Sequence, residues 1–332
     1  MNTRNNYLSS RAKRGDPPRA HGRLPRSFQS LAMTKHVENI LKLKEPFEAL
    51  YQNYSREYLK TDPLWFAHQY QNPLDQEAVA FIASAFAYGS VEQIFKILHS
   101  LLKVMGPSPV KFLRDYCSQP PQKLFEGFYY RFHKSKDIQV FLYLLSEVYR
   151  RENSLGALFK KHYHPDSADL SQALDAFTRE ILSYSVKDYF SSHLLPQNSR
   201  VRFFFSSPKE GSSCKRLNLF LRWMVRKEDG LDLGLWDFAS PSQLTIPLDT
   251  HIYWVASSLG FTRRQSPHWK TAAEITENLK LLDSLDPVKY DFALSRLGIL
   301  ELCPPEELGI PCKKCKKRSD CRRLKGRPSH AF

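Results

Sequence analysis

The sequence lacks long hydrophobic runs and has few signals of β-structure. A membrane-spanning helix needs roughly 18–20 consecutive apolar residues. The nearest candidate, residues 78–88, is too short and contains Ser84. The best strand signal is the run 201–205, and no alternating β-branched stretch accompanies it. These absences predict a mainly α, soluble protein without a membrane partner.

Acidic residues are almost absent from the first 35 residues, which are rich in arginine and show no helical periodicity. We expect residues 1–35 to form a disordered basic arm outside the fold. An organellar transit peptide is one alternative. A start site assigned too early is another, in which case Met33 is the first residue and residues 1–32 are not translated.

Four of the six cysteines lie at the C-terminal end. Only Cys117 and Cys214 lie elsewhere in the chain. No secretory signal precedes them, which favours thiolate ligation in a reducing compartment over disulfides. One Cys-x2-Cys pair flanked by a lone cysteine on each side predicts a single metal centre. This asymmetry favours a cubane iron–sulfur cluster, with Zn²⁺ as the alternative. The four expected ligands are Cys303, Cys312, Cys315 and Cys321.

Basic residues exceed acidic ones by 49 to 34, for a formal net charge of +15. The excess is concentrated in the first 35 residues and in residues 313–327. A polyanion is the natural partner of such a chain, and nucleic acid is our first choice. A charge that serves solubility and an anionic membrane surface are the alternatives.

Helical periodicity dominates the chain after His36. Apolar residues recur at helical spacing over 94–105, where Gly106-Pro107 ends the pattern, and again over 138–149. Residues 78–88 are apolar on every side, as in a helix at the centre of a core. Beyond the arm we expect three parts, which are a helical lobe (36–110), a helical bundle (111–300) and a cysteine loop with a basic tail (301–332).

Two helix starts carry candidate chemistry. Apolar residues at helical spacing predict a helix that begins at Lys215. The positive end of the helix dipole favours the neutral form of the Lys215 amine, which nucleophilic attack needs. The nearby hydroxyls of Ser212 and Ser213 are suited to binding a phosphate together with the exposed backbone N–H groups. Asp249 caps a second helix, which Gly260 ends. On position alone, a capping aspartate and a first-turn lysine are ordinary structural residues.

The run Ile-Pro-Leu-Asp-Thr-His-Ile at 246–252, the stretch 286–298 and the four-cysteine loop resemble the helix-hairpin-helix DNA glycosylases of the endonuclease III type. The separation of Lys215 and Asp249 is closer to that in archaeal 8-oxoguanine glycosylases. Over residues 45–321 the chain is similar to a bacterial family of conserved hypothetical proteins that are relatives of these glycosylases.

This resemblance implies a two-lobed helical glycosylase fold with a [4Fe-4S] cluster, and an enzyme that flips a damaged base out of duplex DNA and cuts its N-glycosidic bond. Asp249 would be the catalytic carboxylate and Lys215 the nucleophile of a lyase. We expect a monomer in the bacterial cytoplasm, associated with the nucleoid. The expected DNA contacts are Ser212, Ser213, Arg216, Lys313, Lys314, Lys316 and Lys317.

The glycosylase hairpin Leu-Pro-Gly-Val-Gly-Arg-Lys is replaced here by residues 208–215, which have one glycine fewer. This difference favours a second hypothesis, a non-catalytic protein that binds an unusual nucleic-acid structure on a glycosylase scaffold. A zinc-stabilised scaffold without a nucleic-acid role is a third.

Overall fold

The computed structural model describes residues 26–53, 56–118, 124–227 and 229–299. The chain divides into two compact units, residues 1–39 and 40–332. Helix α1 (Arg26–Leu41) begins within the segment expected to be an irregular arm. Its apolar residues do not gather on one face, so periodicity gave no sign of this helix. The internal division expected near residue 110 stays a prediction.

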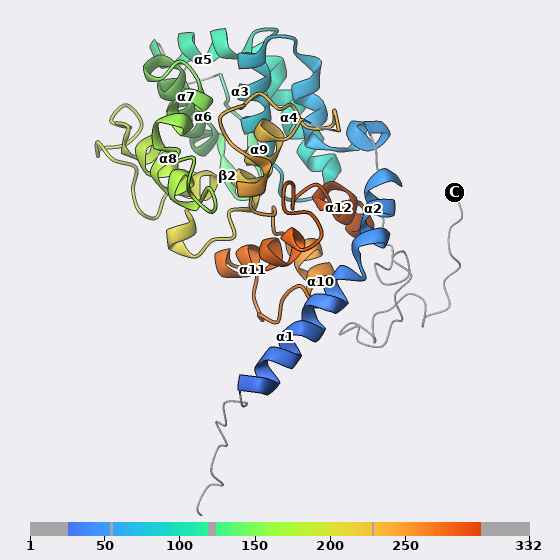
Figure 1. Ribbon diagram of the computed structural model, residues 1–332. Helices are drawn as coiled ribbons and strands as arrows, with labels where there is room; N and C mark the ends of the chain where they lie inside the picture. Colours follow the sequence, from blue (N-terminus) through green and yellow to red (C-terminus); the bar gives the residue numbers. More distant parts are fainter. Residues whose placement is uncertain (1–25, 54–55, 119–123, 228, 300–332) are drawn as a thin grey trace, which may run out of the picture. The chain divides into compact units, whose positions relative to one another are not determined.

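The second unit is mainly helical, as predicted (Figure 1). Its short 3-10 helices are η1 (Arg56–Thr61), η2 (Pro63–Gln69), η3 (Arg200–Phe205), η4 (Pro208–Glu210) and η5 (Pro241–Gln243). Its longer helices are α2 (Lys44–Asn53), α3 (Pro73–Ala85), α4 (Val91–Met105), α5 (Pro109–Ser118), α6 (Ser135–Arg151), α7 (Leu155–His162), α8 (Ser171–Ser183), α9 (Lys215–Val225), α10 (Thr250–Leu259), α11 (Trp269–Lys280) and α12 (Asp291–Ile299).

The predicted helix starts and stops are confirmed where the sequence carried a clear signal. Helix α4 ends at Gly106, which adopts a positive φ of 75°. Helix α10 begins after Asp249, whose carboxylate accepts a hydrogen bond from the N–H of Ile252 at 2.9 Å, and it ends at Gly260. Helix α3 is buried on nearly every side, and it packs against η2 and α9. The all-round apolar segment is therefore the centre of the core.

The run 201–205, the best strand signal in the sequence, forms the 3-10 helix η3. Phe204 and Phe205 are both buried, whereas a strand would send consecutive side chains to opposite faces. The described residues instead contain one small antiparallel hairpin, β1 (Tyr129–Tyr130) and β2 (His133–Lys134). In the described ranges we find no helix with the length and hydrophobicity that crossing a bilayer requires.

Glu77 joins three helices through a buried carboxylate. Its two oxygens accept hydrogen bonds from the Tyr149 hydroxyl, the backbone N–H groups of Leu155 and Gly156, and the Trp236 indole, all at 2.8–2.9 Å. Two of these donors belong to the first turn of α7, so the carboxylate also satisfies a helix N-terminus. A side chain at Gly156 would lie 2.7 Å from the indole nitrogen, so glycine is required there.

Glu77→Gln should lower the free energy of unfolding by about 2–3 kcal/mol, because the amide would point its own N–H groups at donors that need an acceptor. Chemical denaturation measures this change. Asp115→Asn is the matched control, since the exposed ion pair of Asp115 with Lys111 should contribute less than about 1 kcal/mol. Equal effects of the two substitutions would contradict this account of Glu77.

Candidate active site

Lys215 and Asp249, 34 residues apart in the sequence, lie together in the structure. The Lys215 Nζ is 3.7 Å from the Asp249 Oδ2, and the two side chains are 30% and 27% exposed. The same amine donates a hydrogen bond to the backbone carbonyl of Ala87 at 3.1 Å. The two residues that the sequence selected on chemical grounds therefore form one partly accessible acid–amine pair.

The pair forms because two helix N-termini meet. Lys215 is the first residue of α9, and Asp249 is the N-cap of α10. The Ser213 Oγ links the two starts by donating to the carbonyl of Leu248 at 3.2 Å. Cys214, just before α9, has a left-handed φ of 50°, which turns the chain sharply into the helix.

The residues expected to bind phosphate have mixed environments. The Ser212 Oγ accepts from the N–H of Cys214, and Ser213 is engaged with Leu248, so both hydroxyls already stabilise the turn. Arg216 is buried, with its guanidinium 3.4 Å from the centre of the Phe203 ring. Burial lowers the pKa of Arg216 to about 10. The remaining expected residues, which lie outside the described ones, are Lys313, Lys314, Lys316, Lys317, Cys303, Cys312, Cys315 and Cys321.

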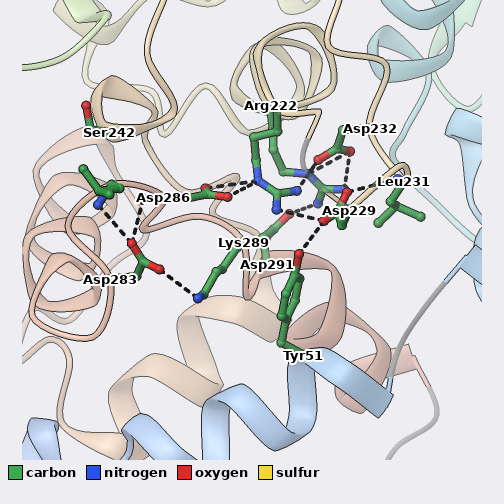
Figure 2. Close-up of polar contacts among 12 residues, drawn as sticks. Tyr51, Arg222, Asp229, Leu231, Asp232, Ser242, Asp283, Asp286, Lys289 and Asp291 are labelled. Atoms are coloured by element: carbon green, nitrogen blue, oxygen red, sulfur yellow. Dashed lines mark hydrogen bonds and ion pairs between the residues drawn. The ribbon is translucent and has the colours of Figure 1, made fainter.

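A buried charged cluster, drawn in Figure 2, contains a carboxyl group whose pKa responds to the pair, and sequence reasoning missed it. Asp291, in the first turn of α12, accepts a hydrogen bond from the Arg222 Nη1 at 2.5 Å. Burial raises the pKa of Asp291 to about 6; Arg222 opposes this shift, and the charge of Asp249 adds to it. Asp291 is thus electrostatically coupled to the candidate pair, although its side chain is fully enclosed.

The cluster extends from Arg222 in α9 to Arg226, the residue that follows this helix. Arg222 and Arg226 both contact Asp232, and all three side chains are almost completely buried. Arg226 also pairs with Asp229 and Asp286 at 2.8 Å. A signal for this cluster was present in the sequence, because Arg222, within a helix of buried apolar residues, and Arg226, directly after that helix, require buried partners.

The described residues contain no group of three histidine, cysteine, aspartate or glutamate side chains arranged to hold a metal ion. Cys214 is buried, and burial raises the pKa of its thiol to about 12, which disfavours the thiolate. The four predicted cluster ligands lie outside the described residues.

The family described as Protein of unknown function (DUF2400) matches residues 62–300. This match spans most of the chain, and the protein belongs to that family. It includes Lys215, Asp249 and the buried cluster. No curated protein and no solved structure matches the chain.

Asp291→Asn should change how stability depends on pH. The pKa of Asp291 rises from about 3.8 to about 6 on folding, so the folded state holds this proton more tightly than the unfolded state does. Its contribution to the free energy of unfolding is then largest below about pH 4 and falls by up to about 3 kcal/mol as the pH rises through 6. Urea titrations measure the free energy of unfolding of both proteins. The value for the native protein minus the value for the variant should fall as the pH rises from about 4 through 6.

Asp283→Asn is the control with the opposite sign. Although burial raises the pKa of Asp283, its hydrogen bond with Lys289 and those from backbone N–H groups lower it overall. The free energy of unfolding of the native protein minus that of the Asp283 variant should therefore rise as the pH increases through the acid range. Parallel pH profiles for the native protein and the Asp291 variant would contradict the raised pKa of Asp291.

Proposed function

We propose that this protein is a DNA glycosylase of the helix-hairpin-helix type, with lyase activity, that acts on a base flipped out of duplex DNA. The observation that carries the proposal is the contact of Lys215 with Asp249 at the meeting of two helix N-termini. The formal charge of +15 supports a polyanionic substrate. Such an enzyme would act in the bacterial cytoplasm at the nucleoid, as a monomer.

The chemistry follows from the two side chains. The Asp249 carboxylate stabilises the positive charge that develops at the anomeric carbon as the glycosidic bond breaks. It also accepts the proton that the Lys215 ammonium must lose before the amine can attack. The amine then forms a bond to the anomeric carbon, and the base leaves with the electrons of the glycosidic bond and takes up a proton. The first adduct is a closed-ring sugar–lysine amine. Its C1′–O4′ bond then breaks, the ring oxygen takes up a proton, and the nitrogen lone pair forms the Schiff base from which strand cleavage by β-elimination proceeds.

A non-catalytic protein that binds a nucleic-acid structure is the second candidate. The hydrogen bond from Lys215 to the carbonyl of Ala87 favours it, because a lysine that is held by two partners also suits a structural role. The unusual turn before Lys215 points the same way.

Lys215→Gln should abolish the covalent adduct that borohydride traps between the protein and a lesion-bearing oligonucleotide, because glutamine has no nucleophilic amine. The measurement is gel mobility across a panel of oligonucleotides, each with one damaged base. Lys209→Gln should trap normally, since Lys209 is an exposed lysine near the same turn that pairs with Asp175. Tight binding by the native protein without trapping or base release on any lesion would favour the non-catalytic candidate.

The cysteine quartet is the proposed site of a [4Fe-4S] cluster, for which four thiolates form a suitable donor set. When bound, the cluster would supply structural stability to the basic loop around Lys313. Zinc is the alternative metal, and it would give a colourless protein.

Anaerobically purified protein should be brown and contain iron and sulfide in equal amounts, about four of each per chain. Cys312→Ser should lose most of both, because it removes one of four ligands. Cys117→Ser lies outside the quartet and should retain them. A colourless native protein that contains one equivalent of zinc would exclude the iron–sulfur cluster.

A further inference from the structure

Only three phenylalanine, tyrosine or tryptophan side chains in the described ranges are classed as exposed, and they lie near one another. They are Tyr129, Phe132 and Phe203, exposed by 64%, 37% and 38%. Phe132 and Phe203 come from segments 71 residues apart, yet their ring centres are 5.0 Å apart. We call these three residues the aromatic surface. Exposed aromatic rings gathered at one place indicate a binding site rather than chance exposure.

The hairpin that carries two of these residues is firmly held. Its two-residue loop consists of Arg131, which has a left-handed φ of 54°, and Phe132. The carbonyl of Phe132 accepts a hydrogen bond from the Arg200 Nη1 at 2.6 Å. His133 bonds to the Tyr88 hydroxyl and to the carbonyl of Arg200, and burial lowers the pKa of His133 to about 4, so its ring is neutral at physiological pH. The loop is thus fixed before any ligand binds.

Phe203 is supported from below by a cation. The Arg216 guanidinium lies 3.4 Å from its ring centre, and the Tyr88 ring packs edge-on against it at 5.0 Å. One face of Phe203 is occupied by Arg216, while the ring remains exposed elsewhere. This arrangement leaves an oriented aromatic ring on which a flat ligand can stack.

A groove of about 840 Å³ adjoins the hairpin, and Tyr129 and Phe132 are among its lining residues. Lys96 and Arg131 contribute positive charge to the lining, and Glu126 is its one acidic residue. Stacking rings beside an excess of positive charge match a ligand that is both aromatic and anionic. Nucleic acid with unstacked bases has this chemistry.

The aromatic surface lies next to the candidate pair. The carbonyl of Ala87 accepts the hydrogen bond from Lys215. Tyr88, which follows Ala87, and Arg216, which follows Lys215, both contact the ring of Phe203. Two pairs of consecutive residues therefore connect the amine to the aromatic rings. The groove itself is not lined by Lys215 or Asp249, so it extends the site rather than enclosing the pair.

We propose that the aromatic surface binds the unpaired bases of single-stranded DNA, with Lys96 and Arg131 contacting the adjacent phosphates. This inference rests on the proposed function. It adds the substrate class, which is DNA with an unpaired stretch. It requires tighter binding to a single strand or a bubble than to an intact duplex.

The test is fluorescence anisotropy of the full chain with a labelled single strand, a bubble duplex and an intact duplex. Phe132→Ala and Tyr129→Ala should each raise the Kd for the single strand about tenfold, since stacking on one ring contributes roughly 1–3 kcal/mol per base. Tyr129→Phe should restore binding because it keeps the ring. Leu285→Ala is the control for an exposed apolar residue elsewhere, and it should bind as the native protein does. Circular dichroism verifies that each variant is folded.

Single-strand binding that is unchanged in folded Phe132→Ala and Tyr129→Ala would overturn the inference, as would a preference for the intact duplex. So would a native dimer that Phe132→Ala converts to a monomer, since the surface would then be occupied by a second copy. Base release is scored separately. Ring-dependent binding without base release would refute only the glycosylase, and base release with ring-independent binding would refute only the aromatic surface.

Discussion

Two buried arginines, one in α9 and one directly after it, fix the part of the molecule on which the candidate site depends. Arg222 and Arg226 contact four aspartates from three later segments, which are Asp229, Asp232, Asp286 and Asp291. Removing one partner of a buried pair leaves an uncompensated charge at a cost of several kcal/mol. The position of α9 relative to α12 is therefore strongly determined, and with it the position of Lys215 at the start of α9.

The charges of this cluster are not balanced. Four carboxylates surround two guanidinium groups, so full ionisation would leave an excess of two negative charges in a buried volume. Although burial opposes their charge, the aspartates raise the pKa of both arginines above the usual value. The excess appears instead at Asp286 and Asp291, where burial raises the pKa of each carboxyl despite the neighbouring arginine. The acid nearest the candidate pair is thus one of the two that hold protons most readily.

Local signals in the sequence predicted the helices and their ends, because caps and glycine stops act through neighbouring residues. Asp249 and Gly260 delimit α10 for this reason. The run 201–205 gave a strand signal but no sign of η3, because the burial of Phe204 and Phe205 depends on partners distant in the sequence, such as Phe86 and Phe141. The hairpin was missed because its strands have two residues each, too few to show alternation.

The candidate site was likewise predicted only in part from the sequence. Lys215 and Asp249 were selected one by one, from their helix starts and from a family resemblance, but no local pattern encodes their distance. Asp291 was part of the stretch 286–298 that carried the resemblance, without a role assigned to it. Its function in the structure depends on Arg222, 69 residues earlier, and a pairing of that kind becomes visible only after folding.

Exposure separates the buried charges of the cluster from the charges of the candidate pair. The side chains of Arg222 and Asp232 are 2% and 0% exposed, and they already determine where α9 lies. The Lys215–Asp249 contact is longer, at 3.7 Å, and about 30% exposed, so it adds little to stability. The Asp249 carboxylate caps α10, but capping does not require an amine beside it. The proposed reaction needs a nucleophile and an acid–base group within reach of solvent, and this is the physical reason for proposing that the chemistry occurs at the two helix starts.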